Sequence, residues 1–160
     1  MERAFLKIDN FPGTSCVPGF EGQIELTSFQ YGCNQPTVPV QSYEPPRPGR
    51  TMHYMVKFSK HPDSSSGCFC QALWLGQTLE KAELTACLLG EGTPAPFLKI
   101  VLEDVIIADY NLINSEGATK EIISMNFSKI ALHFAGEAGR ETNVCHDLRS
   151  NEVQRLGSVK

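Results

Sequence analysis

The chain has 160 residues, of which 41% are hydrophobic and 20% are charged, and its formal net charge at neutral pH is -4. This composition fits one globular domain covering residues 1–160 and argues against wholesale disorder. A negative net charge, with no dense run of Lys and Arg, gives no electrostatic reason to expect a nucleic-acid or anionic-membrane partner, and we expect neither.

The N-terminal residues MERAFLKIDNF are charged and lack the apolar core of a signal peptide. No stretch approaches the ~18 uncharged apolar residues of a membrane-spanning helix, so we expect no membrane insertion. Without a signal peptide the six cysteines are expected to remain thiols in a reducing compartment. The pair Cys68 and Cys70 is expected to consist of small buried apolar residues and not of metal ligands.

Alternation of apolar and polar side chains predicts strands along most of the chain. The first two cover residues 4–8 and 22–32, and others cover 53–60, with Tyr54 on the buried face, and 81–89. Residues 34–50 hold five prolines, which cannot donate to a central sheet, so this segment is expected to be a long loop.

Residues 61–77 contain the only expected helix, which should be short. Phe69, Ala72 and Leu73 form a narrow apolar stripe at helical spacing. Asp63 or Ser64 can cap its first turn and Gly76 can end it. Trp74 falls off the stripe and is expected in the core or at an interface.

Three predicted strands reverse their side-chain phase midway. In residues 22–32, Ile24 and Leu26 occupy even positions, whereas Phe29 and Tyr31 occupy odd ones. Because side chains on a strand alternate with a period of two, one flat strand cannot bury both pairs. The same reversal occurs within 97–109 and within 121–134, so bends are expected at Thr27-Ser28, Glu103-Asp104 and Ser128-Lys129.

The predicted fold is therefore mainly β. It is a bent-strand β-barrel or two-sheet sandwich, with one short α-helix on the outside and a long extended loop. Residues 109–120 are expected to form a loose polar hairpin with its tip at 115–117. Beyond Gly136 the pattern fades, and the tail 137–160 is expected to be mobile or to be ordered by partners.

No cluster of residues in the sequence predicts an active site. Cys145, His146 and Asp147 are adjacent, but neighbouring residues on a strand or loop point their side chains apart, whereas a nucleophilic pair needs hydrogen-bond contact. Phosphate-binding loops of the G-x-x-x-x-G-K type are absent from the sequence. We therefore expect no catalytic, cofactor-binding or metal-binding residues, and no enzyme activity.

The order of segments resembles a known family. AFLKIDNFPG precedes GQIELTSFQYG, and MVKFSKHPD, with Lys60 and Asp63, precedes the helix SSSGCFCQALWLGQ. FLKIVLEDVIIADYNL and KEIISMNFSKIALHF then follow. Over about residues 4–134 this order is similar to the haemolysin co-regulated protein (Hcp) family, the tube-forming proteins of bacterial type VI secretion. The loop after Cys33 departs from the family in being rich in proline, and the tail after Gly136 does not match the family's usual end.

The resemblance implies a homohexameric ring, with rings stacked into a hollow tube that is expelled with a spike from a contractile sheath. The tube can carry or chaperone effector proteins. It also implies assembly in the bacterial cytoplasm, followed by secretion to the extracellular space or a target cell without a signal peptide. The long loop would contact the next ring, and its candidate anchors are Val38, Val40, Tyr43 and Arg47.

Apolar residues on the phase opposite the main buried set are candidates for contacts within a ring, unless the helix covers them. They are Phe5, Val101 and Ile106. Two other functions stay open at this point. One is a monomeric β-barrel that binds a small apolar ligand, and the other is the tail-tube protein of a contractile phage. A cysteine-dependent enzyme ranks last.

Overall fold

The computed structural model describes residues 1–38, 45–136 and 139–159. One helix and fourteen strands form in these residues. They are β1 (Glu2–Ile8), β2 (Ile24–Leu26), β3 (Ser28–Gln30), β4 (Cys33–Asn34), β5 (Thr37–Val38), β6 (Arg47–Pro48), β7 (Met52–His53), β8 (Val56–Lys60), α1 (Ser66–Leu75), β9 (Thr78–Leu88), β10 (Ala95–Ser115), β11 (Ala118–Asn126), β12 (Lys129–Ala135), β13 (Glu141–Asp147) and β14 (Glu152–Val159).

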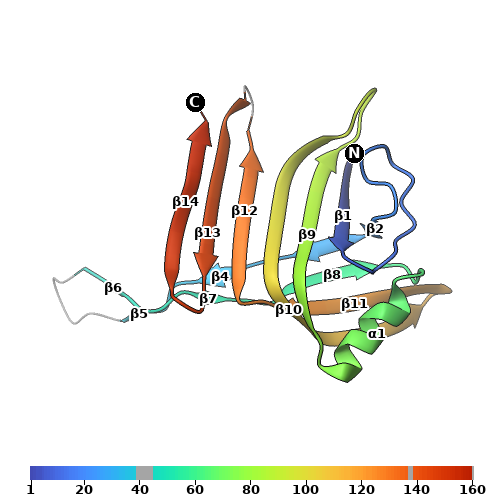
Figure 1. The fold of residues 1–160 in the computed structure, drawn as a ribbon, viewed down its shortest axis with the longest axis horizontal. Coiled ribbons are helices and arrows are strands. Elements are labelled where there is room, and N and C mark those ends of the chain that lie inside the picture. The colour runs from blue at the N-terminus through green and yellow to red at the C-terminus, as the bar shows by residue number, and fades with distance from the viewer. Residues whose placement is uncertain (39–44, 137–138, 160) are drawn as a thin grey trace.

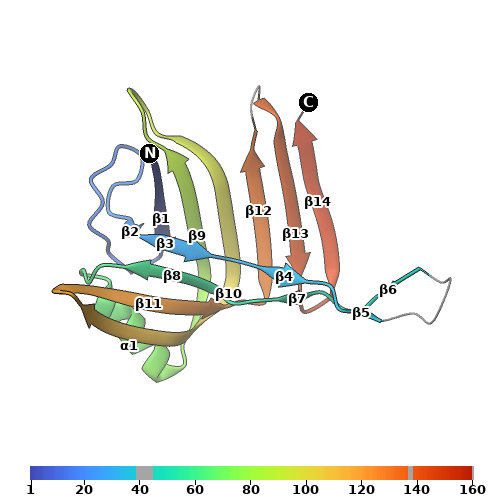
Figure 2. The same cartoon turned by 180° about the vertical axis from the view of Figure 1, so that it is seen from behind.

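The strands form two layers that share the long strand β10 (Figures 1 and 2). Its first half pairs with β12, and β13 and β14 extend the sheet beyond β12. Its second half pairs with β11, which pairs with β8 and then β3. On its other edge β10 pairs with β9, which continues to β1 and β2. All of these pairings are antiparallel, and the predicted mainly-β fold is confirmed.

All three predicted bends are confirmed. Thr27 separates β2, which pairs with β1, from β3, which pairs with β8. At Asp104 the backbone takes a positive φ of 52°, and β10 changes partner from β12 to β11 immediately after it. Ser128 lies in the short break between β11 and β12. At each bend a strand passes from one sheet to the other, and so both apolar phases reach the same core.

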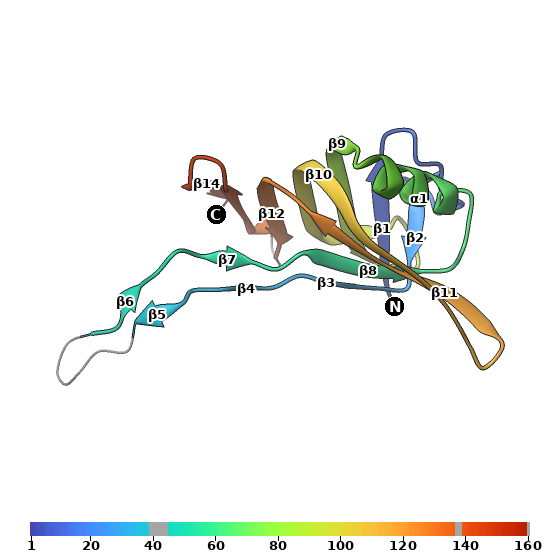
Figure 3. The same cartoon turned by 90° about the horizontal axis from the view of Figure 1, so that it is seen from below.

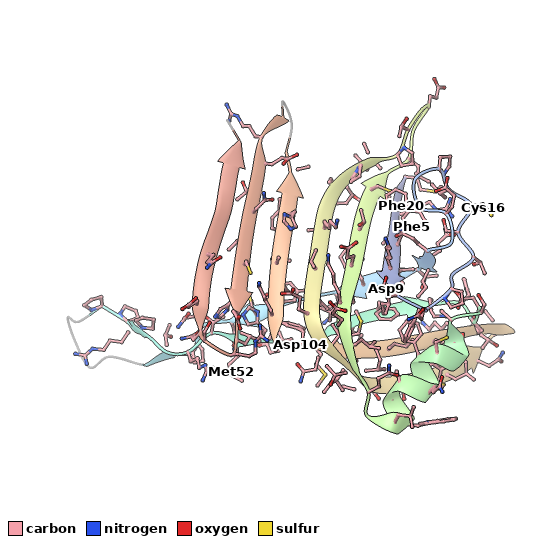
Figure 4. All side chains as sticks on the ribbon, in the orientation of Figure 1. Phe5, Asp9, Cys16, Phe20, Met52 and Asp104 are labelled. Atoms are coloured by element: carbon pink, nitrogen blue, oxygen red, sulfur yellow. The ribbon has the colours of Figure 1, made fainter. Side chains whose placement is uncertain are left out.

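Two of the bends are joined by hydrogen bonds. The Ser128 backbone N–H donates to the Glu103 carbonyl oxygen over 3.1 Å, and its hydroxyl donates to the Asp104 carboxylate over 2.9 Å. Arg149, in the turn after β13, donates to the same carboxylate over 2.8 Å. Figure 4 shows Asp104 at this corner, at the lower end of the gap between the β10 and β12 ribbons. These hydrogen bonds hold three segments together: the bend in β10, the break between β11 and β12, and the turn after β13.

The sheet does not close into a continuous barrel. Its strand pairings end at β14, β2 and β3. β2 and β3 are the two halves of one bent segment, and Thr27 between them donates its backbone N–H to the Ser59 carbonyl oxygen over 2.8 Å. The result is a two-sheet sandwich. One cluster of buried apolar side chains lies between its layers, and Phe58, Phe69, Ile107 and Met125 are among its largest fully or almost fully buried members.

The short helix is confirmed, but its start differs from the prediction. Ser65, not Asp63 or Ser64, is the N-cap residue, and Asp63 instead accepts the Ser65 backbone N–H over 2.8 Å. Gly76 ends the helix in the left-handed conformation with a φ of 61°, as expected. Trp74 is 80% exposed and is not part of the core. The described residues include no helix with the length and apolar character needed to cross a bilayer.

The predicted hairpin at residues 109–120 is confirmed, and it is regular. Its turn consists of Glu116 and Gly117, both at positive φ, within the predicted tip. In the C-terminal segment, residues 141–147 pair along the whole of β12, and residues 152–159 pair with them. The sequence did not predict these C-terminal strands, because their polar residues lack the apolar alternation of strands with one buried face.

A buried ionic cluster holds the helix to the sheet. The Lys60 ammonium, fully buried at the end of β8, lies 2.7 Å from a carboxylate oxygen of Glu121 on β11 and 2.8 Å from one of Asp63. The hydroxyls of Ser66 on α1 and Tyr110 on β10 also donate to Glu121. Four elements therefore meet at one charge-paired site.

Contacts in the ionic cluster shift the pKa values of Asp63 and Tyr110. Burial alone would raise the pKa of Asp63, but hydrogen bonds from Lys60 and Ser65 hold that pKa below its usual range. Burial and the hydrogen bond to Glu121 raise the pKa of Tyr110. The folded chain binds a proton on Asp63 less readily than the unfolded chain does. The ionised Asp63 therefore stabilises the fold above about pH 4, and this stabilisation is lost as the pH falls through the lowered pKa.

We expect Lys60→Met to lower the free energy of unfolding by about 3–5 kcal/mol, because it leaves two buried carboxylates without their cation. Urea denaturation followed by circular dichroism measures this loss. Lys57→Met is the matched control, since Lys57 lies on the same strand and is exposed. Equal stability of the two variants would contradict the role given to the ionic cluster.

Candidate subunit interfaces

A long arm projects from the sandwich, made of the four short strands β4 to β7 (Figure 3). β4 pairs with β7, and β5 pairs with β6. Between these ladders the Thr51 hydroxyl donates to the Gln35 side-chain oxygen over 2.9 Å, and the Gly49 backbone N–H donates to the Pro36 carbonyl oxygen over 2.7 Å. A Cβ atom at Gly49 would lie 2.7 Å from that oxygen, so the arm needs glycine there. The predicted long loop is thus an extended two-stranded arm.

Two of the four predicted ring-stacking residues lie on this arm. Val38 and Arg47 are opposite each other in the β5–β6 ladder, and Arg47 is exposed. Val40 and Tyr43 lie outside the described residues. The arm leaves the sandwich at the end opposite the tip of the β10–β11 hairpin (Figure 3), so Val38 and Arg47 are held away from the body of the chain.

The assignment of Phe5 to a subunit contact needs correction. Its side chain is fully buried and stacks on Phe20 of the same chain, with ring centroids 4.5 Å apart and planes at 14° (Figure 4). Phe5, Phe20 and Cys87 form a second small core, with Val17 and Leu89 packed against it. The segment 10–22, and not the helix, covers Phe5. This explains why Phe5 is apolar although it lies on the phase opposite the main buried set.

Val101 and Ile106 lie on opposite sides of the bend in β10 and differ in surroundings. Ile106 is 44% exposed, just beyond Asp104, between Thr78 of β9 and Asn126 of β11. Val101 is half-buried on the face of the sheet turned away from the core. Only Ile106 therefore offers a substantial exposed apolar surface.

The face around Val101 carries paired charges. Glu83 lies 2.7 Å from the ammonium of Lys81 and 3.8 Å from that of Lys99, and Lys129 lies 3.3 Å from Glu103. The hydrogen bond from Lys81 holds the pKa of Glu83 below its usual range. These pairs run across β9, β10 and β12, so this wall of the sandwich is polar while its charges offset one another.

Two of the three adjacent residues considered as a catalytic cluster, His146 and Asp147, make hydrogen bonds to residues outside that cluster. His146 bonds to His53, whereas Asp147 accepts two side-chain hydrogen bonds from Arg149, each 3.1 Å long. All six cysteines are free; Cys87 and Cys145 are buried, but Cys68 and Cys70 are only half-buried, contrary to expectation. Within the described residues no group of three or more His, Cys, Asp or Glu side chains is arranged to hold a metal ion.

Comparison with known proteins decides the family. The sequence profile described as "Type VI secretion system effector, Hcp" matches residues 5–134, which is most of the chain. The chain belongs to the Hcp family. Among curated proteins, no sequence matches it.

Solved structures share the fold of this Hcp-family chain. The crystal structure of Hcp1 from Salmonella typhimurium has a TM-score of 0.81 at 20% identity, covering 96% of this chain and 99% of that one. A type VI secretion system effector from Yersinia pestis has a TM-score of 0.72 at 19% identity, covering 90% and 98%. A further Hcp protein has a TM-score of 0.78 at 24% identity, covering 93% and 99%. Together with the family match, they support a tube protein of a type VI secretion system.

The structure also exposes apolar residues that the sequence did not single out. Met52, Tyr54 and Met55 are 46–56% exposed where the arm meets the sandwich, so the expected burial of Tyr54 is wrong. Leu112 and Ile113 are exposed on the β10–β11 hairpin. Each of these segments places neighbouring apolar residues on both strand phases. Together with the reversal at Ile106, that pattern is the signal that could have marked them as candidate contacts.

Proposed function

We propose that this Hcp-family chain forms six-membered rings that stack into the hollow tube of a type VI secretion system. The family assignment carries this proposal. Two features of the chain support it: an exposed apolar residue, Ile106, at the bend of β10, and an extended arm that can reach an adjacent ring. A closed ring needs a head-to-tail interface in which two different surfaces of the chain meet, and the two layers offer different surfaces.

We further propose that the charged wall around Glu83 and Lys99 faces the channel of the tube. The helix residues Phe69 and Ala72 pack into the core on one face of β9 and β10, whereas this wall lies on the opposite face of those strands. The paired charges keep the wall polar without a strong net field. A polar, charge-paired wall lets a folded cargo pass without adhering through apolar contact. Effector cargo would enter this channel, and a spike and a contractile sheath would act on the assembled tube.

The proposed role is mechanical and not catalytic, because a conduit acts by its shape and its assembly. Assembly would take place in the bacterial cytoplasm, and the tube would then leave the cell through its own secretion machine. The interior between the two sheets is filled by the core cluster, which favours this role over a monomeric barrel that holds a small apolar ligand inside.

We expect Ile106→Asp to break the ring while leaving the monomer folded. A carboxylate buried without a partner in an interface costs more than about 1.4 kcal/mol, which raises the dissociation constant more than about tenfold. Sedimentation velocity measures the shift from rings to monomers, and circular dichroism checks the fold. Asn111→Asp, an exposed site on the same strand, is the control and should remain a ring. A ring of unchanged stability in Ile106→Asp would remove Ile106 from the interface.

A second variant tests the arm. Replacing Tyr43 and Arg47 by Ala should leave single rings intact but shorten the tubes seen by negative-stain electron microscopy, because aromatic and Arg side chains supply much of the energy at the centre of contacts. Arg140→Ala, an exposed change elsewhere, is the control. Tubes of wild-type length in the double variant would show that the arm does not mediate stacking.

A further inference from the structure

A chain of hydrogen bonds connects the base of the arm to the C-terminal hairpin. The Tyr31 hydroxyl lies 2.7 Å from Nδ1 of His53, and Nε2 of His53 lies 2.7 Å from Nδ1 of His146. Nε2 of His146 lies 3.0 Å from the side-chain oxygen of Asn151. His53 belongs to β7 and His146 to β13, 93 residues further along the chain. These contacts tie two exposed elements of the molecule to each other.

The groups at the two ends of this hydrogen-bond network, Tyr31 and Asn151, determine which ring nitrogens of His53 and His146 carry a proton. The Asn151 oxygen can only accept, so His146 donates from Nε2 and, as a neutral ring, accepts at Nδ1. His53 must then donate from Nε2 and accept at Nδ1, where the Tyr31 hydroxyl donates. With both imidazoles neutral, this arrangement satisfies all three hydrogen bonds. If both rings were protonated, the N–H of His53 would face the N–H of His146.

The surroundings favour neutral rings. The His53 ring lies 6.0 Å from the ring of Phe127 and 6.1 Å from that of Tyr31, measured between centroids, and beside it a pocket is lined by Ile130, Leu132, Val144 and Val153. Burial, and then the nearby His146, lower the pKa of His53. Burial and the neighbouring Cys33 raise the pKa of Tyr31, which keeps its hydroxyl protonated as a donor.

The charged groups around the pair are engaged elsewhere. From the arm, the Arg50 guanidinium donates to the Leu148 carbonyl oxygen over 3.2 Å. Lys129 of β12 pairs with Glu103, and Asp147 of β13 pairs with Arg149. The other titratable or charged groups near the pair are Cys33 of β4, Cys145 of β13 and Glu152 at the start of β14. None of these carboxylates bonds to either imidazole in the described contacts, so an added proton there has no ion-pair partner.

We propose that His53 and His146 form a pH-sensitive latch, which holds the arm against the C-terminal hairpin when neutral and releases it when protonated. In the latched state the two rings cannot both be protonated, because the N–H groups of His53 and His146 would then face each other. In the released state both rings can carry a proton and are hydrated. Since the latched state binds protons less readily than the free state, latching weakens as the pH falls below the ordinary imidazole value of about 6.5. If the arm stacks rings, as proposed above, acid would also loosen the tube, but the latch itself acts within one chain.

Hydrogen–deuterium exchange of the Tyr54 amide tests the latch. This N–H donates to the Gly32 carbonyl oxygen over 2.9 Å at the base of the arm. Between about pH 7.5 and about pH 5, we expect its protection, corrected for the intrinsic exchange rate, to fall about tenfold, the effect of one pKa unit. Amides of the β1–β9 ladder should keep their protection, which separates release of the arm from global unfolding.

The variant His53→Gln/His146→Gln, which cannot take up these protons, should lose the pH dependence. His133→Gln is the matched control, because His133 bonds to Asn143 and not to the latch, and it should behave as the wild type. Equal wild-type protection at both pH values, or the wild-type pH dependence in the double variant, would overturn the latch. Because the readout is local to the arm, a latch can fail while rings and tubes form, and it can hold in a chain that forms neither.

Discussion

The alternation of side chains along a strand is the constraint on which this structure depends. A strand with apolar residues in two phases can bury both only if it bends, and three segments of this chain do so. The bends at Asp104 and Ser128 also bond to each other, through the Ser128 backbone and hydroxyl, and Arg149 closes the corner from the C-terminal turn. The arrangement of the two sheets around the main core and the path of the C-terminal strands follow from this corner.

The buried ionic cluster complements the bends by fixing the helix. Lys60, Glu121 and Asp63 pair across a short distance in an apolar environment, where the charges are costly unless all are satisfied. The cluster therefore specifies one position for α1 on one side of the molecule. The charged wall, the arm and Ile106 stay at the surface, where the proposed tube would place contacts or the channel.

The sequence was sufficient for features that depend on local spacing. The three bends, the helix ending at Gly76 and the tip of the β10–β11 hairpin all follow from periodicity and glycine positions. Long-range pairings were beyond it: Lys60 and Glu121 are 61 residues apart, and His53 and His146 are 93 apart. The cover of Phe5 by Phe20 was missed because a turn-rich segment carries no periodic signal, and the C-terminal strands were missed because their polar residues lack one.

Native mass spectrometry of the purified wild-type chain at submicromolar concentration tests the central claim most directly. The account predicts a particle of six times the 17.7 kDa chain, in which neighbouring copies would cover exposed apolar residues such as Ile106. A species of single-chain mass at every concentration would contradict it.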